Sequence, residues 1–77
     1  MTEQDRAVRT RLALIRSAAE QFEARGYFRA GLAEISAGAG VGSGALHFHF
    51  ANKDAVAEAV EQAAESPARG RGRSSRR

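Results

Sequence analysis

The sequence predicts an all-α fold of three short helices followed by the start of a fourth helix. In the first part of the chain, apolar residues recur at steps of three and four, which is the spacing of one helix face. Glycines then separate the periodic segments, and an alanine-rich segment follows Asn52. Helices joined by tight turns explain these features, and no flanking strands are indicated.

The first helix is expected to run from Val8 to a stop at Gly26. Gly26 suits the position after a helix because glycine accepts a positive φ without a Cβ penalty. Residues 1–7 are polar, and we expect them to be frayed. The helix would carry one inward-facing apolar stripe, formed by Val8, Leu12, Ile15, Ala19 and Phe22.

A second helix is expected over Leu32–Gly38, and a third from about Gly42 to Phe50. Gly31 is a weak N-cap for the second helix, and Glu34 stands at the position of a capping-box acid. The glycine-rich turn between these helices contains one large residue, Val41, which would anchor the turn in the core.

A fourth helix would begin after Asn52, which is a good N-cap, and continue to about Glu65. This segment is rich in alanine, the best helix former, and Ser66-Pro67 would end it. The residues assigned to the core are Leu12, Ile15, Phe22, Ile35, Val41, Leu46 and Phe50.

The composition excludes several classes of protein. The chain has no cysteine, which excludes disulfides and cysteine-ligated metals. No apolar run approaches the roughly 20 residues that a membrane span needs, and the charged N-terminus is not a signal peptide. We therefore expect a cytoplasmic protein of one domain without a membrane partner.

Catalytic, metal and nucleotide sites are not indicated. The sequence offers no set of nucleophile, base and acid, so we expect no enzyme activity and no cofactor. His47 and His49 are two residues apart, and residues at that spacing do not share a helix face as a metal-binding pair would. The glycines of residues 38–44 fit neither the dinucleotide-binding spacing nor the phosphate-loop spacing.

Two short helices joined by a glycine turn, with another helix packed across them, form the helix-turn-helix pattern of homeodomain-like DNA-binding domains. The second helix of such a pair lies in the major groove, with its N-terminal residues at the base edges. Small residues at the turn and at the tip of that helix allow the backbone to approach DNA closely. Backbone N–H groups at a helix N-terminus also attract phosphate.

The segment LAEISAGAGVGSGALHFHFANKDAV, residues 32–56, resembles the DNA-binding signature of TetR-family transcriptional regulators. The preceding segment RSAAEQFEARGYFRAGLAEI resembles the first helix of that family. Within the family, LHFHFANKDAVAEAV is most similar to the receptors for γ-butyrolactone signals such as A-factor. The resemblance implies a DNA-binding domain at residues 8–66, with the helix-turn-helix motif at about 31–50.

The resemblance also implies which residues contact DNA. The third helix would offer Ser43, Gly44, Ala45 and His47 to the groove. His49 and Lys53 would contact phosphates, and Phe48 would pack against the DNA backbone. The implied DNA-binding residues are Gly31, Ser43, Gly44, Ala45, His47, Phe48, His49 and Lys53.

Four positions depart from the family pattern. Gly31 and Gly42 replace a serine or threonine, Ser43 replaces a common lysine, and His47 replaces a tyrosine. Each change removes a hydroxyl or a charge that would touch DNA. We therefore expect weaker binding than in a typical member of the family.

The implied function is sequence-specific binding of a double-stranded DNA operator by a transcriptional repressor. Full-length relatives carry a C-terminal domain that binds a small ligand and forms a dimer, and we expect this chain to lack it. We accordingly expect no small-molecule ligand and a monomer, because no large apolar face should be left over. The alternative is a non-functional remnant, or a helical interaction module without useful DNA affinity.

The basic charge of the chain is concentrated at its C-terminus. The net charge is +3, but residues 67–77 hold five arginines and no acid. Residues 1–66 then hold seven basic and nine acidic residues, a net charge of −2. We expect residues 67–77 to be a disordered tail. Its arginines either add affinity for DNA phosphates without reading bases, or have no selected role.

Overall fold

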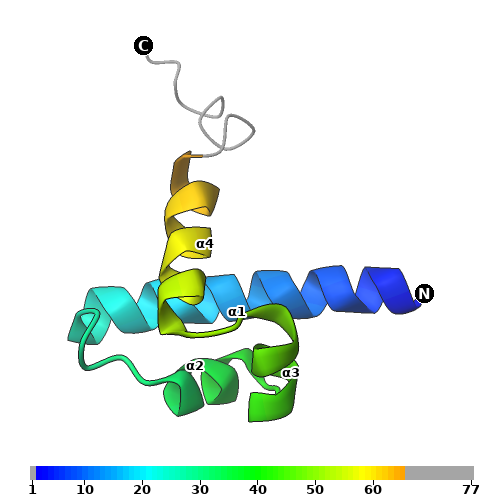
Figure 1. Cartoon of the computed structure of the whole chain (residues 1–77), viewed down its shortest axis with the longest axis horizontal. Helices are drawn as coiled ribbons and strands as arrows, with labels where there is room; N and C mark the ends of the chain where they lie inside the picture. The colour runs from blue at the N-terminus through cyan, green and yellow to red at the C-terminus, as the bar shows by residue number, and fades with distance from the viewer. Residues whose placement is uncertain (1, 66–77) are drawn as a thin grey trace.

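The computed structural model describes residues 2–65, which form four helices (Figure 1). The helices are α1 (Glu3–Arg25), α2 (Leu32–Ala39), α3 (Ser43–His49) and α4 (Lys53–Glu65). The predicted tail at residues 67–77 and the predicted helix stop at Ser66-Pro67 lie outside the described residues. The all-α prediction is confirmed, and the boundaries of α2, α3 and α4 differ from the expected ones by one residue or less.

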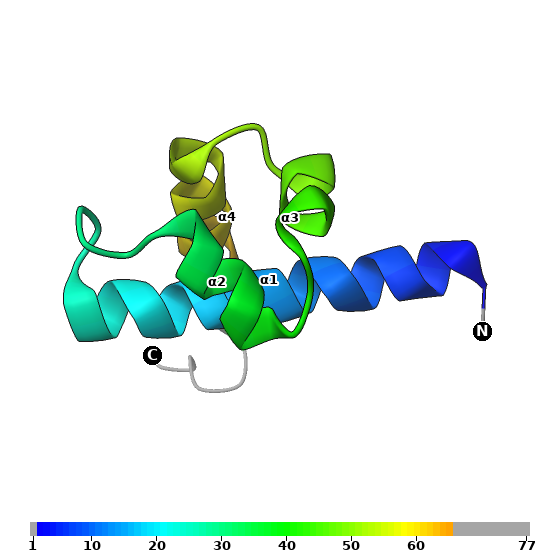
Figure 2. The same cartoon turned by 90° about the horizontal axis from the view of Figure 1, so that it is seen from below.

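α1 is the platform on which the other three helices pack. α2 and α3 lie side by side along α1, and α4 runs across it and projects away from that pair (Figures 1 and 2). The first turns of α1 extend beyond the other helices in both views. Within residues 2–65, none of the helices combines the length and apolar character that a membrane crossing requires.

α1 begins at Glu3, so the expectation of a frayed N-terminal segment is wrong for residues 2–7, which the structure describes. The hydroxyl of Thr2 accepts a hydrogen bond from the Asp5 N–H at 3.0 Å. The Asp5 carboxylate in turn accepts one from the Thr2 N–H at 3.4 Å. This reciprocal capping box satisfies two N–H groups that a frayed end would leave to water. The acidic residues of this first turn also complement the positive end of the helix dipole.

The core forms on a different face of α1 from the one predicted. Leu14 and Ala18 are completely buried, whereas Leu12 is 55% exposed and Val8 is 51% exposed. Ile15 and Phe22, the other large members of the predicted stripe, are half-buried at the edge of the core. The core residues are Leu14, Ala18, Ile35, Leu46, Phe50, Val56 and Ala59.

The remaining core predictions agree with the structure. Ile35, Leu46 and Phe50 are buried, and Val41 packs against them from the turn. Gly26 follows α1 with φ of +83°, and its N–H donates to the Phe22 carbonyl at 2.8 Å. These contacts confirm the predicted end of the first helix.

α1 and α2 approach closely at one buried hydrogen bond. The Ser17 hydroxyl donates to the Ile35 carbonyl at 2.8 Å. A Cβ at Gly38 would press against the Ser17 hydroxyl, so glycine is required there for this helix spacing. Asn52 also acts as predicted: its side-chain oxygen accepts from the Ala55 N–H at 2.8 Å at the start of α4.

An apolar groove of about 380 Å³ remains open between α1 and α4. The sequence analysis expected no large apolar face to be left over, and this groove contradicts that reason for a monomer. The monomeric state itself stays a prediction. The groove is lined by Leu12, Ile15, Arg16, Ala19, Val60, Ala63 and Ala64.

We predict that Leu14→Ala destabilises the domain far more than Leu12→Ala. Truncating a fully buried leucine leaves a cavity and costs about 2–5 kcal/mol. Truncating the half-exposed Leu12 should cost about 1 kcal/mol at most. Urea unfolding followed by helical circular dichroism compares the two variants. Equal unfolding midpoints, or a lower midpoint for Leu12→Ala, would show that the core assignment is wrong.

Candidate nucleic-acid interface

The turn between α2 and α3 holds the two helices in a fixed relation. Gly40 adopts the left-handed conformation with φ of +77°, and the Val41 N–H donates to the Ser36 carbonyl at 3.0 Å. Val41 is half-buried against the core, as predicted. Gly42 forms the N-cap of α3 without a side-chain cap. The backbone at the tip of α3 is therefore uncovered.

α3 buries one of its seven residues, Leu46, and presents the rest to the surface. Ser43 and Gly44 are exposed and Ala45 is half-buried, so the first turn carries only small side chains. The structure thus brings six of the eight predicted DNA-binding residues together on one short helix, from Ser43 to His49.

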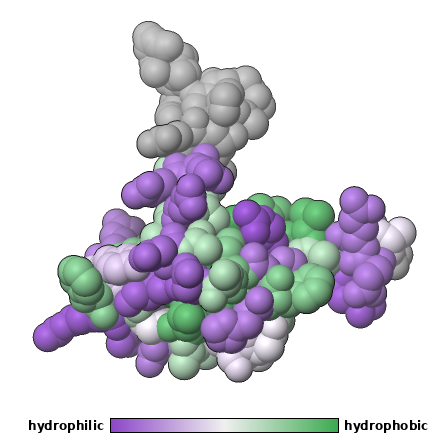
Figure 3. All heavy atoms as spheres, in the orientation of Figure 1, coloured by the Kyte–Doolittle hydropathy of each residue, from purple (hydrophilic) through white to green (hydrophobic). Residues whose placement is uncertain are grey.

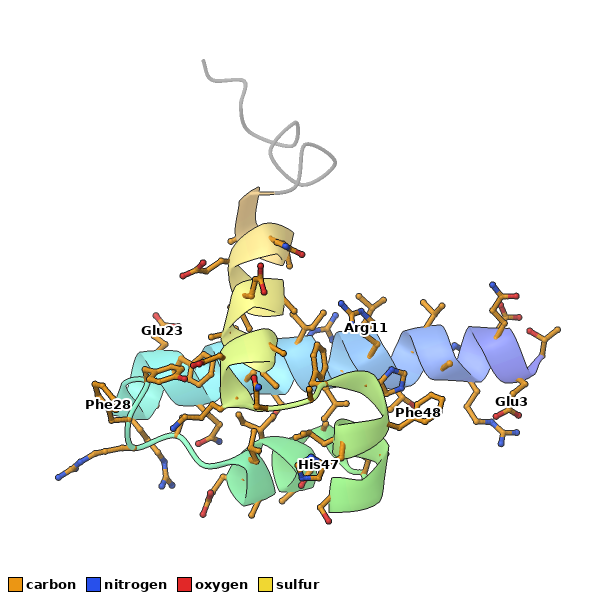
Figure 4. All side chains as sticks on the ribbon, in the orientation of Figure 1. Glu3, Arg11, Glu23, Phe28, His47 and Phe48 are labelled. Carbon is orange, nitrogen blue, oxygen red and sulfur yellow. The ribbon has the colours of Figure 1, made fainter. Side chains whose placement is uncertain are left out.

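The two large exposed side chains of α3 leave the helix in different directions (Figure 4). Phe48 is 81% exposed and points toward the first half of α1. His47 is exposed as well, and His49 is half-buried. Within residues 2–65, the acidic and histidine side chains form no group that could hold a metal ion.

A shallow hollow of about 260 Å³ separates α3 from the first turns of α1. Sequence reasoning missed this part of the surface because it expected residues 1–7 to fray. The Thr2-x-x-Asp5 capping pattern was the signal that could have found it. The hollow is lined by Glu3, Arg6, Ala7, Thr10, Ala45, Phe48 and His49.

Lys53 makes contacts within the protein that the sequence did not predict, and its predicted phosphate contact stays a prediction. Its ammonium donates hydrogen bonds to the carbonyls of Tyr27 at 2.8 Å, Ala30 at 2.9 Å and Phe28 at 3.4 Å. It also lies 4.6 Å from the centre of the Tyr27 ring. An ammonium group has three N–H donors, and these carbonyls accept from all three within the described residues. Lys53 thereby fixes the α1–α2 loop (residues 26–31) to the start of α4.

The neighbouring residue of α4 holds the same loop. The Tyr27 hydroxyl donates a hydrogen bond to the Asp54 carboxylate. This hydrogen bond raises the pKa of Tyr27 above its ordinary value of 10.0, and partial desolvation and the negative charge of Asp54 act in the same direction. The Tyr27 ring packs between Phe22, at 5.6 Å between ring centres, and Phe28, at 5.4 Å.

Gly31, the remaining predicted DNA contact, is the N-cap of α2 and makes no side-chain cap. The carboxylate of Glu34 lies against the position that a Cβ at residue 31 would occupy. A serine or threonine at this position would therefore require the Glu34 side chain to move. The start of α2 offers backbone N–H groups, but with a carboxylate beside them.

Comparisons with known proteins agree on one family. Residues 14–60 match the family described as bacterial regulatory proteins, tetR family. Over 60 residues the chain is 47% identical to the A-factor receptor protein of Streptomyces griseus. That match covers 78% of this chain and 22% of the receptor, so the chain spans about a fifth of the length of this relative. No solved structure matches the chain.

We predict that Tyr27 titrates at a higher pH in the folded chain than in the unfolded chain. A raised folded-state pKa means that folding favours the neutral phenol. The resulting stabilisation is complete below the ordinary pKa of about 10 and is lost as the pH rises through the folded-state value. Tyr27 is the only tyrosine, so ultraviolet absorbance follows it alone.

The variant Asp54→Asn should lower the folded-state pKa of Tyr27, because it removes the charged acceptor. Both proteins should titrate together in denaturant, which serves as the control. A wild-type chain that titrates at the same pH with and without denaturant would contradict the hydrogen bond to Asp54.

Proposed function

The chain belongs to the tetR family of bacterial regulatory proteins, and we propose that it represses transcription by binding a double-stranded DNA operator through α3. In this proposal Ser43, Gly44, Ala45 and His47 face the base edges in the major groove. Phe48, His49 and the start of α2 at Gly31 lie along the sugar-phosphate backbone. The phosphate contact of Lys53 stays a prediction, because its ammonium holds the α1–α2 loop.

The observation that carries this proposal is the uncovered first turn of α3. Its side chains are small, its N-cap adds no side-chain cap, and the core contact of the helix is confined to Leu46. A helix of this kind can bring its backbone close to base edges without moving any packed side chain. The exposed His47 then adds a ring with hydrogen-bonding capacity on the next turn.

Several finer points belong to the same proposal. We place the DNA-binding unit at residues 8–66, as the sequence predicts, and extend it to the start of α1. The name of the relative from Streptomyces griseus indicates that it receives A-factor. The resemblance assigns ligand binding to a C-terminal domain, so we propose no small-molecule ligand and no catalytic activity for the described residues. A repressor of this family acts in the cytoplasm, where bacterial DNA lies.

The test is selection of duplexes from a randomised DNA pool by the wild-type chain. Fluorescence anisotropy then compares a selected duplex with a scrambled duplex of the same composition, between about 50 and 200 mM salt. We expect the selected duplex to bind at least about tenfold more tightly, which is 1.4 kcal/mol. Equal affinity for both duplexes at every salt concentration would contradict the proposal and favour a remnant without a regulatory role.

We further predict that His47→Tyr tightens binding to the selected duplex. A phenol reaches further than an imidazole and offers a hydroxyl to phosphate. One net hydrogen bond contributes about 0.5–1.5 kcal/mol, which corresponds to about a two- to twelvefold lower Kd. His47→Phe is the matched control, because it supplies the ring without the hydroxyl and should give no such gain. If His47→Tyr binds no more tightly than His47→Phe, residue 47 does not face the DNA.

A further inference from the structure

The α1–α2 loop carries the most exposed large apolar side chain of the described residues. Phe28 is 92% exposed, more than Phe48 at 81%. Its backbone is nevertheless held in place, because the carbonyls of Tyr27, Phe28 and Ala30 all accept hydrogen bonds from Lys53. The Phe28 ring also meets the Tyr27 ring edge to face. The loop therefore presents Phe28 to solvent in a defined position.

The side chains beside Phe28 are basic. Arg29 follows it directly and Arg25 ends α1, and both are exposed. Neither forms an ion pair with any of the residues that the structure describes. Arg25 has a structural reason to be at a helix C-terminus, since it complements the helix dipole. Arg29 lies in the loop after the end of α1, so the helix dipole does not explain its presence.

Three acids lie near this end of the molecule: Glu23 on α1, Asp54 at the start of α4, and Glu34 at the start of α2, whose carboxylate lies beside Gly31. The Asp54 carboxylate accepts a hydrogen bond from the neutral Tyr27 hydroxyl and keeps its negative charge, which the ammonium of the preceding residue, Lys53, opposes. Glu23 lies on α1 two residues before Arg25, but its side chain leaves the helix on the side of α4 (Figure 4). Figure 3 shows a small apolar projection among hydrophilic atoms at the Phe28 end of the molecule. A single ring of this kind is too small for a protein-docking patch, which normally needs a contiguous apolar area.

The α1–α2 loop lies close to the α2–α3 pair, and α3 is the helix proposed to enter the major groove. The loop leads through Gly31 into α2, and Phe28 and Phe48 lie at opposite ends of the α2–α3 pair, with His47 between them (Figure 4). A helix in the major groove has a sugar-phosphate backbone on each side of it. With α3 in that groove, as proposed above, the two exposed phenylalanines lie on the sides of its two flanking backbones.

We propose that Phe28 and Arg29 form a second DNA contact, on the backbone that flanks the start of α2. Arg29 pairs with a phosphate, and Phe28 packs on the adjacent deoxyribose. A charged group next to an apolar ring matches the alternation of phosphate and sugar along a strand. Such a contact positions the domain and carries no sequence information. The inference rests on the proposed DNA-binding function and adds a site to it.

The first test is the salt dependence of binding to the selected duplex. Arg29→Ala should reduce the slope of log Kd against log salt concentration by about 0.9, the value for one lost phosphate contact. Arg16→Ala is the matched control, because Arg16 lines the groove between α1 and α4 and should leave the slope unchanged. Phe28→Ala should raise Kd by about three- to tenfold at constant slope, because apolar contact area is lost. Equal slopes for Arg29→Ala and Arg16→Ala would overturn the proposal.

The second test uses the absence of tryptophan from the chain. Phe28→Trp places a single fluorophore at the proposed contact, and saturating duplex should quench or shift its emission. Leu12→Trp, in the groove between α1 and α4, is the control and should show no change. An unchanged emission of Phe28→Trp while anisotropy reports binding would overturn the contact. A shift that depends on protein concentration without DNA would also overturn it, since Phe28 would then contact a second copy.

These outcomes separate the inference from the proposed function. Wild-type binding that depends on salt but not on sequence contradicts an operator-binding repressor. The slope difference between Arg29→Ala and Arg16→Ala can still confirm or overturn the backbone contact in that case. A wild-type chain that binds no duplex at all overturns both.

Discussion

The arrangement of the segment that leads into α2 depends on the ammonium of Lys53. The loop between α1 and α2 has carbonyls that no helix satisfies, and three of them converge on this one group. A buried or half-buried carbonyl without a partner is costly, so the loop is stable in this form only with a donor at its centre. The next residue, Asp54, accepts from Tyr27 in the same loop. Two consecutive residues at the start of α4 therefore fix the segment that leads into α2.

The core imposes a second constraint, because it is small and shared by all four helices. Its four largest fully buried side chains, Leu14, Ile35, Leu46 and Val56, come one from each helix. α3 contributes Leu46 as its only fully buried side chain, and Phe50 secures the chain directly after it. The helix is thus held at one point on its inner side. The other residues of α3 are not fully buried, so the core does not require them to be large or apolar. Small or polar side chains, which suit the proposed groove contact, can therefore stand there.

The sequence predicted most of the helix boundaries, because the residues that begin and end these helices act locally. Gly26, Asn52 and the glycine turn before α3 act through their own backbone geometry or their own side chain, so their neighbours in space hardly matter. The inward face of α1 could not be found in the same way. Leu12, Leu14 and Ile15 are all apolar, and periodicity cannot tell which of them meets α2 and α4 in a helix that contacts three partners. The carbonyls that accept hydrogen bonds from Lys53 lie more than twenty residues away in sequence. No local sequence pattern could therefore indicate that Lys53 holds the loop.

A domain with a net negative charge can bind DNA when enough of its acids lie away from the helix that enters the groove. α4 carries acidic residues along its exposed side, including Glu58 and Glu61, and it projects away from α2 and α3 (Figure 1). At physiological salt, charges separated by more than about 8 Å are largely screened from each other by solvent. In the proposed complex, Glu58 and Glu61 therefore act little on a strand beside α3, whereas Arg29 on the α1–α2 loop acts at contact distance. Under the proposed function, the affinity for DNA would depend on the charges next to α2 and α3, Arg29 and Glu34 among them, more than on the sum of the charges.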